Sequence, residues 1–332
     1  MPLIGKSEVH ILIVMCTVNM KKSELKKKYF EKGAAALKNI ASVDQECYCC
    51  PICTQLYVVE ALEAGILTLE HAPPKKVGGK PIALTCKECN SAAGYSVDSA
   101  VVQRQRQLDF TKAVIGQKLN YKGRATFLIG EETINVNFER DQDIASIKPL
   151  EEINDPKKLK AYQDYMMYLQ QAGKWDGQKF TITPNAKYHH KYSKVGDLKA
   201  AFIICFAFFG YRFALHERLS TVREQIINYK EDIIDHYWHT SDPKITREHF
   251  LFLIEKPFTA LAVKLDNSTV ILPWVKGPND FYKYLGDHFT NRKPVIFDGL
   301  FFNWPQSLEM RLDFIKTHNE SIQPTDDKTA SG

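Results

Sequence analysis

The chain has 332 residues, of which 44% are hydrophobic and 25% charged, so it is long enough to form two globular domains. This composition excludes collagenous, disordered and disulfide-scaffold proteins. The net charge of +5 arises entirely from residues 1–120, where sixteen lysines and arginines face eleven acidic residues.

The first residues of the chain resemble an export signal only weakly. Lys6 precedes a short apolar run, but no small-residue cleavage site follows it, so we expect a cytoplasmic protein. Met15 and Met20 are alternative starts, and residues 1–20 are therefore expected to be non-native or disordered. No apolar stretch approaches the roughly 20 residues that span a bilayer, so we expect no transmembrane helix and no membrane partner.

A basic helix is predicted over residues 21–40, because apolar residues recur there with helical spacing. Seven lysines lie between residues 21 and 38, against two glutamates. Two interpretations remain open for this charge: a solvated helix face, or a surface that binds an anionic partner such as a phosphate backbone.

Six of the eight cysteines lie between residues 47 and 89, which indicates metal binding rather than disulfides in a chain without an export signal. Two CxxC pairs, Cys50/Cys53 and Cys86/Cys89, can present four thiolates tetrahedrally to a structural Zn²⁺ ion. Cys47 and Cys50 have the same spacing, but the intervening Pro-Ile favours Cys50 and Cys53 as the first pair.

Between the two CxxC pairs the pattern predicts a small αβ unit. A helix is expected over Leu56–Ala64, ending at Gly65, followed by strands at Ile66–Leu69 and Pro81–Thr85 with a proline- and glycine-rich loop between them. Residues 90–107 then read as mostly helical, which completes a strand, loop, strand, helix order.

The remainder of the chain predicts alternating strands and helices. The expected helices are Glu151–Gln171 and the strongly apolar Leu198–Leu215, which contains a buried Cys205. The expected strands are two within Asn120–Phe138, then Phe180–Thr183, Phe250–Ile254, Ala260–Leu265, Val270–Pro273 and Val295–Phe297. We predict an α+β protein with a zinc-stapled domain at residues 21–107, a separate α+β domain at residues 108–320, and a disordered tail at residues 321–332.

The segment Leu69-Glu-His-Ala-Pro-Pro74, followed by Gly78-Gly79 and by Cys86-Lys-Glu-Cys89-Asn90, resembles the zinc-containing branch of the HNH endonuclease family. The resemblance covers roughly residues 47–100. It implies a ββα-metal nuclease module that cleaves nucleic-acid phosphodiester bonds with a divalent ion. By motif position, His71 is the general base, and Glu70 and Asn90 bind the divalent ion.

The chemistry of these side chains agrees with the roles that the resemblance implies. An imidazole with an ordinary pKa near 6.5 can accept a proton from water at neutral pH, and the oxygens of Glu70 and Asn90 suit Mg²⁺ or Mn²⁺. Adjacent residues of a regular strand point to opposite faces, so Glu70 and His71 can share one site only if the backbone twists there.

The sequence departs from the family pattern at two positions. Thr85 and Gly94 stand where some members have a further polar residue or metal ligand. Asp98 lies eight residues after Asn90, or about 12 Å along a regular helix, so the predicted site excludes it unless Gly94 breaks the helix.

Basic residues near the motif are expected to contact a nucleic-acid backbone without reading its sequence: Lys75, Lys76, Lys80, Arg104 and Arg106. DNA is favoured over RNA as the target. The family resemblance implies a role in bacterial phage defence or in a mobile element, with residues 108–320 selecting a target, a protein partner or a second copy of the chain. The alternative is a zinc-stapled module that binds nucleic acid or protein without cutting.

Overall fold

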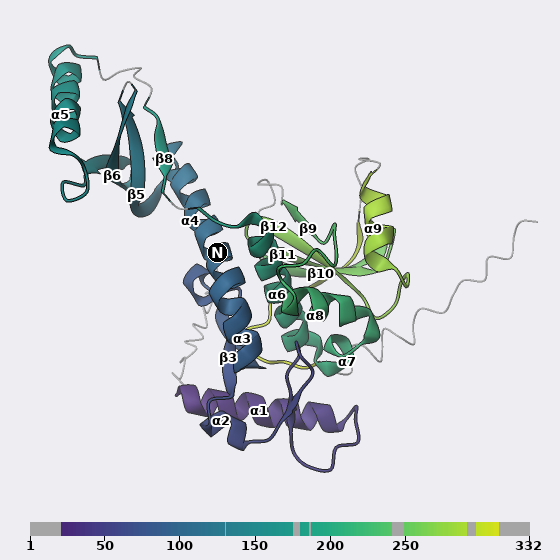
Figure 1. Ribbon diagram of the computed structural model, residues 1–332. Coiled ribbons are helices and arrows are strands. Elements are labelled where there is room, and N and C mark those ends of the chain that lie inside the picture. Colours follow the sequence, from purple (N-terminus) through teal and green to yellow (C-terminus); the bar gives the residue numbers. More distant parts are fainter. Residues whose placement is uncertain are drawn as a thin grey trace, which may run out of the picture.

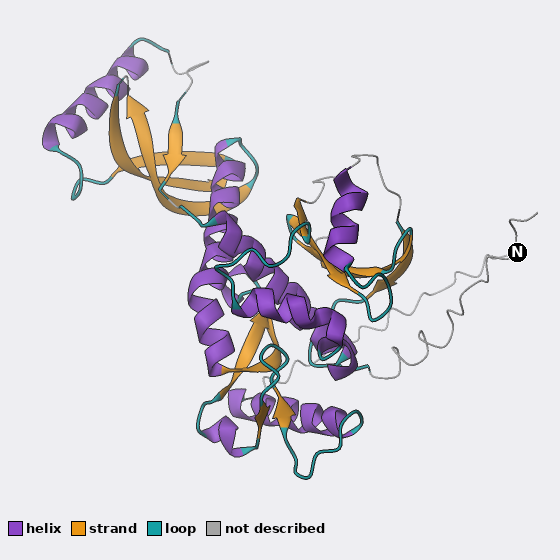
Figure 2. Ribbon diagram, turned by 45° about the vertical axis from the view of Figure 1, so that its right-hand side comes forward, coloured by secondary structure: helices purple, strands orange, loops and turns teal. Residues whose placement is uncertain are grey.

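The computed structural model describes residues 21–129, 131–174, 180–185, 187–240, 249–290 and 297–311. The fold is mixed α+β, with small sheets arranged around a group of central helices (Figures 1 and 2). The predicted N-terminal and C-terminal tails, residues 1–20 and 321–332, lie outside the described residues. No helix in the described part of the chain is long and apolar enough to cross a membrane.

The N-terminal region confirms the predicted order of strand, loop, strand and helix. Its elements are α1 (Lys22–Lys38), β1 (Tyr48–Cys49), β2 (Leu56–Tyr57), α2 (Glu60–Glu63), β3 (Leu67–Ala72), the 3₁₀ turn η1 (Lys75–Val77), β4 (Lys80–Cys86), α3 (Lys87–Ala93), the π-helical turn η2 (Gly94–Asp98) and α4 (Ser99–Val114). β3 and β4 form an antiparallel hairpin, and α3 follows β4 directly. The helix predicted from Leu56 is wrong at its start, because Leu56 and Tyr57 pair with β1 to close the first cysteine knuckle.

A lobe at the far end of α4 is built from residues 119–185 (Figure 1). Its elements are β5 (Leu119–Ile129), β6 (Glu132–Gln142), β7 (Ile144–Pro149), α5 (Pro156–Gln171) and β8 (Ile182–Pro184), and its sheet has the order β7-β6-β5-β8. Alternate residues of β5 and β6 are buried, including Phe127 and Val136, and they pack against Tyr162 of α5 and Phe110 of α4. The lobe therefore has a core of its own.

The rest of the chain forms helices and a larger sheet. The elements are α6 (His190–Phe209), α7 (Tyr211–Ala214), η3 (Glu217–Leu219), α8 (Ser220–Ile227), β9 (Trp238–Thr240), β10 (His249–Lys256), β11 (Ala260–Leu265), β12 (Ser268–Pro273), α9 (Phe281–Thr290) and β13 (Asp298–Phe302). The sheet has the order β13-β10-β11-β12-β9. Leu251 and Leu253 of β10 face the core that contains α6, whereas Phe252 and Ile254 face α9, so helices cover both faces.

A domain boundary was predicted at residue 107, but the hydrophobic core continues across this point. One continuous cluster joins Tyr29 and Phe30 of α1, Leu84 of β4, Phe206 of α6 and Leu251 of β10. The apolar helix α6 packs on the cysteine-containing region on one side and on the larger sheet on the other. The described residues from 190 onward therefore share one hydrophobic core with the cysteine-containing region, whereas the lobe has a separate cluster.

Two predicted helices begin or end at other residues, for local reasons. α5 begins at Pro156 and not Glu151, because the Asp155 side chain caps the helix by accepting a hydrogen bond from the Lys157 amide. α6 ends at Phe209, since Gly210 has a φ of +77°, a conformation that glycine adopts readily and that breaks the helix before Leu215.

Candidate functional site

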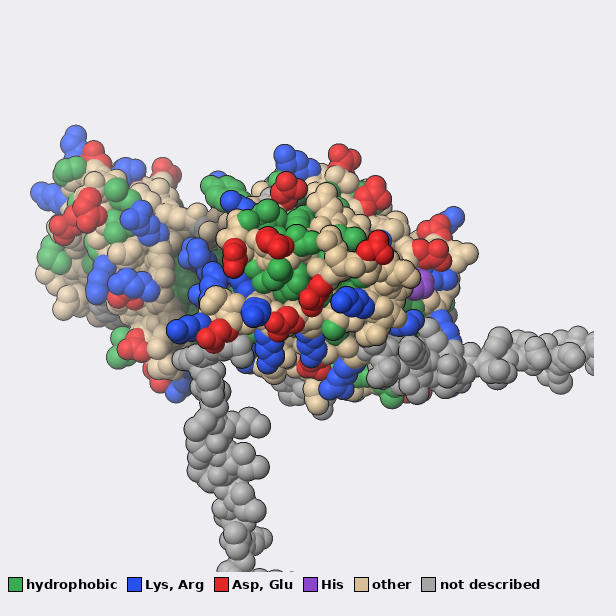
Figure 3. All heavy atoms as spheres, turned by 90° about the horizontal axis from the view of Figure 1, so that it is seen from below, with side chains coloured by type: hydrophobic (Ala, Val, Ile, Leu, Met, Phe, Trp, Pro, Cys, Tyr) green, Lys and Arg blue, Asp and Glu red, His purple; other side chains and the backbone are tan. Residues whose placement is uncertain are grey.

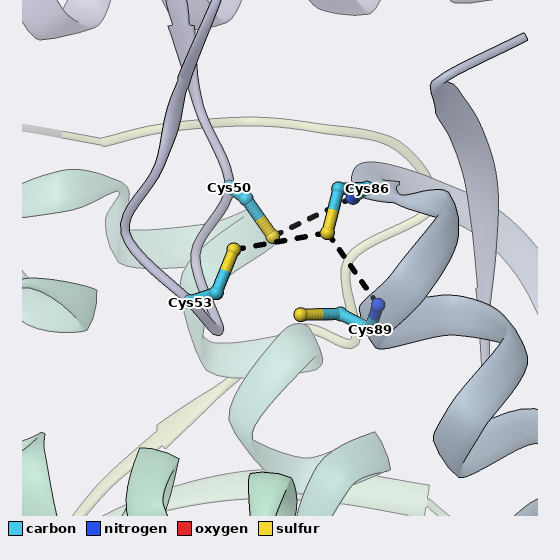
Figure 4. A group of neighbouring side chains, drawn as sticks. All are labelled: Cys50, Cys53, Cys86 and Cys89. Atoms are coloured by element: carbon cyan, nitrogen blue, oxygen red, sulfur yellow. Dashed lines mark hydrogen bonds between the residues drawn. The ribbon is translucent and has the colours of Figure 1, made fainter.

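Four cysteines converge from the two ends of the hairpin region, as the spacing predicted. The Sγ atoms of Cys50, Cys53, Cys86 and Cys89 all lie within 4.8 Å of one another and point toward a common centre (Figure 4). A tetrahedron with Zn–S bonds of about 2.3 Å has edges of about 3.8 Å. The Cys53–Cys86 Sγ distance is 3.7 Å, so this cluster has the dimensions of a structural zinc site.

The choice of Cys50 and Cys53 as the first pair is confirmed, since Cys47 is buried outside the cluster. The Cys86 amide donates to Cys50 Sγ at 3.5 Å, an interaction that favours a charged sulfur. Within the cluster itself, hydrogen bonds from the Cys50 thiol lower the pKa of Cys53 to about 7 and also lower the pKa of Cys86, whereas the same bonds raise the pKa of Cys50. Thiolates are the form that binds metal, so the cluster is chemically suited to a closed site that holds Zn²⁺.

A β-bulge lies at the position where the sequence required a twist. β3 and β4 pair regularly up to Glu70 opposite Ala83, but His71 is opposite Pro81, which leaves Ile82 as an extra residue on β4. A bulge of this kind increases the local twist and re-aims side chains. Glu70 and His71 consequently line the same cavity, although they are adjacent residues of one strand.

This cavity has a volume of about 520 Å³ and lies between the hairpin and the helices that follow it. We call it the catalytic cavity after the role that the sequence predicts for three of its residues. Its lining includes all three predicted catalytic residues: Glu70, His71 and Asn90. The loop that closes one side requires Gly79, because a Cβ atom there would collide with the backbone carbonyl of Pro73. The hairpin loop and the start of α3 thus bring the three residues to one cavity.

Glu70 is almost completely buried, and both of its carboxylate oxygens have partners. One oxygen is 2.9 Å from the ammonium of Lys199 in α6, and the other accepts a hydrogen bond of 2.8 Å from the Thr85 hydroxyl. Burial raises the pKa of Glu70, against the opposing effect of the Lys199 charge. Each carboxylate oxygen has a second lone pair, so these contacts leave acceptor capacity for a cation.

His71 is partly buried and has the protonation state that a general base needs. Its burial, reinforced by the positive charges of Lys75 and Lys22, lowers the pKa of His71 below its ordinary value, against the effect of Asp98. The imidazole is therefore mainly neutral at pH 7 and can accept a proton.

Asn90 is oriented by hydrogen bonds to the neighbouring strand. Its Nδ2 donates to Thr68 Oγ1 at 2.8 Å and to the Leu69 carbonyl at 3.2 Å. Because both of these bonds use the amide nitrogen, the Oδ1 atom is the part of the side chain suited to a cation in the catalytic cavity.

Three of the five predicted phosphate-binding residues line the catalytic cavity: Lys75, Lys76 and Arg106. Lys80 lies elsewhere and donates to Gln306. The prediction for Arg104 is wrong, because its guanidinium is largely buried and forms an ion pair of 2.8 Å with Asp197 of α6.

The lysines of α1 lie mostly exposed along one side of the molecule. Figure 3 views the molecule from the side on which α1 lies and shows lysine and arginine side chains interspersed with acidic ones. Lys27, for example, pairs with Glu31 at 3.9 Å, and Lys26 donates to the Leu67 carbonyl. The basic helix is confirmed, while its binding to an anionic partner stays a prediction.

Two residues of the site were not predicted from the sequence. Lys199 contacts Glu70 from a helix more than a hundred residues further along the chain. Asp98, which the sequence excluded on its spacing from Asn90, also lines the catalytic cavity and lies at the end of the π-helical turn η2.

The chain matches no protein-family model, and no curated protein or solved structure is significantly similar to it.

Proposed function

We propose that this protein is a metal-dependent endonuclease of the HNH type, which hydrolyses phosphodiester bonds in the catalytic cavity. The observation that carries the proposal is the β-bulge between Glu70 and His71, which lets a carboxylate and an imidazole from adjacent residues share one cavity with Asn90. The Cys₄ cluster supports it, because the cluster fixes the ends of the strands and helix that carry these side chains.

Each group has a distinct role in this proposal. His71, held neutral by its surroundings, takes a proton from the attacking water. Glu70 and Asn90 hold Mg²⁺ or Mn²⁺, which supplies charge stabilisation at the scissile phosphate when it is bound. Lys75, Lys76 and Arg106 hold the phosphate backbone without reading sequence. DNA is the proposed substrate, and RNA is an alternative outcome of the assay.

The test is incubation of the full chain with duplex DNA, single-stranded DNA and RNA, each with Mg²⁺, Mn²⁺ or EDTA. We expect cleavage with a divalent ion and a loss of about 100- to 10,000-fold in rate for His71→Ala, the usual contribution of a general base. His216→Ala is the matched control, because burial also lowers the pKa of His216 but this residue caps η3 and does not line the cavity.

A second candidate function has one observation in its favour. Lys199 already neutralises Glu70, so the catalytic cavity could bind phosphates with its lysines and arginine in a protein that does not cut. Binding of DNA that is equally tight in EDTA, together with no cleavage by the wild-type protein, would favour this zinc-stapled binding module over the nuclease.

A further inference from the structure

A buried lysine lies beneath the catalytic cavity and contacts two carboxylates at once. Lys199 is 1% exposed, and its Nζ atom is 2.9 Å from Glu70 Oε1 and 3.1 Å from Asp98 Oδ2. Burial works to lower the pKa of Lys199, but the two ion pairs outweigh it and raise the pKa above its ordinary value. These two contacts link β3 to η2.

The approach of α6 to η2 is what brings these groups together. Gly196 lies one turn before Lys199, and a Cβ atom at Gly196 would lie 2.8 Å from the Val97 carbonyl oxygen and would collide with the Val101 side chain. Glycine thus lets α6 pack closely against the segment that carries Asp98. α6 itself lies outside residues 47–100, the part of the chain that resembles HNH nucleases.

The arrangement leaves one side of the two carboxylates open to the catalytic cavity. Glu70 and Asp98 line the cavity, whereas Lys199 does not. Since the two oxygens contact the same nitrogen at 2.9 and 3.1 Å, they lie at most about 6 Å apart. The Asp98 side chain keeps 21% of its exposure, in contrast with 3% for Glu70.

Two carboxylates, those of Glu70 and Asp98, share the one ammonium of Lys199 at the floor of the cavity, which Asn90 also lines. Burying an ammonium is costly unless its partners offset the lost solvation, and Lys199 has two carboxylates that do so.

We propose that Lys199 is a positioning residue that holds Glu70 and Asp98 together at the cavity floor, so that both carboxylates, with Asn90, bind the divalent cation. This inference rests on the proposed function for the identity of the site. It adds Asp98 to the proposed cation ligands, and it adds Lys199 of α6 as the residue that positions them. The nuclease region would then require α6 for activity.

The test is titration of the zinc-loaded full chain with Mn²⁺ in the absence of nucleic acid, followed by calorimetry. We expect Lys199→Met to weaken Mn²⁺ binding by about 10- to 100-fold, the usual effect of removing a group that orients metal ligands. Lys199→Arg keeps the positive charge and should restore most of the affinity. Lys264→Met is the matched control, because Lys264 is equally buried but bonds to the Asp266 carbonyl in the larger sheet.

A second variant keeps the inference testable if Lys199→Met does not fold. Asp98→Asn should also weaken Mn²⁺ binding by about 10-fold or more. Asp109→Asn is its control, since Asp109 lies on α4 away from the cavity and bonds to Gln105. Unchanged Mn²⁺ affinity in Asp98→Asn overturns the inference, and so does unchanged affinity in a folded Lys199→Met.

The remaining outcomes separate this inference from the proposed function. Tighter Mn²⁺ binding by Lys199→Met would mean that the lysine competes with the cation, which contradicts a positioning role. Suppose that the wild-type protein cuts no nucleic acid, but that its Mn²⁺ binding weakens in Asp98→Asn and in Lys199→Met. That result would support this inference and refute the nuclease. A wild-type protein that binds no Mn²⁺ would refute the cation site and the nuclease together.

Discussion

The hairpin β3–β4 is fixed to the rest of the molecule by two different electrostatic devices. At the end of β4, Cys86 joins a cluster of four thiols, all from residues 50–89, that are suited to a metal ion. In the middle of β3, Glu70 joins an ion pair with Lys199, a residue of α6. The first device needs a cation from solution, whereas the second is made entirely by the chain.

This difference decides how each device responds to change. A metal site gathers most of its stability from one ion, so loss of that ion removes the whole contribution. A buried ion pair is stabilising only relative to its broken form, because desolvation offsets most of the attraction between the charges. The cysteine cluster should therefore control whether the region folds, and the ion pair should control how its cavity is arranged.

The largest effect is expected from breaking the cysteine cluster. Zinc binding supplies about 10–16 kcal/mol in zinc-finger peptides, as much as the whole stability of a typical domain. We expect Cys86→Ser to lose zinc and to unfold the hairpin and α3. Zinc content by mass spectrometry and thermal unfolding measure the two effects.

Cys47→Ser is the control for this experiment, because Cys47 is buried and has CxxC spacing to Cys50 but lies outside the cluster. It should keep its zinc. Equal loss of zinc in both variants would contradict the assignment of Cys50 and Cys53 as the first pair.

A smaller effect on stability is expected from the ion pair. Lys199→Met leaves two carboxylates without their shared ammonium, and breaking a buried pair costs about 3–5 kcal/mol. Lys264→Met should cost less, because Asp266 keeps its contact with His249 at 2.9 Å. Urea denaturation measures both free energies of unfolding, and equal losses would show that Lys199 has no special role in the fold.

The sequence predicted the parts of the site that depend on local spacing. The two CxxC pairs, the strand that ends in Glu70-His71 and the helix start at Asn90 all lie within short segments, and their convergence follows from one hairpin and one turn. From the sequence, Glu70 and His71 could share one site only if the strand twisted between them. The β-bulge at Ile82 provides that twist.

The parts that the sequence did not predict depend on contacts between distant residues. In the sequence alone Arg104 looks unpaired, because its partner Asp197 lies in another helix, 93 residues away. The apolar sequence of α6 predicts burial, but it does not show that the helix shares a core with the cysteine-containing region. Asp98 was excluded on the rise of a regular helix, and the π-helical turn changes that geometry.

The smallest expected effect tests a hydrogen bond that ties the cysteine region to α7. The buried Tyr211 hydroxyl donates to the Cys49 carbonyl at 2.8 Å and accepts from the Cys49 amide at 3.0 Å. Tyr211→Phe leaves both backbone groups without this partner, so we expect a loss of about 1–3 kcal/mol in the free energy of unfolding. Zinc content should not change, because Cys49 lies outside the cluster.

Tyr162→Phe in the lobe is the matched variant, because the Tyr162 hydroxyl makes one long bond of 3.4 Å to the Ile147 carbonyl. A bond of that length is weak, and its removal should cost less than the loss of the Tyr211 hydroxyl. Urea denaturation compares the two. If Tyr211→Phe proved as stable as the wild type, the hydrogen bonds between α7 and Cys49 would contribute nothing to stability.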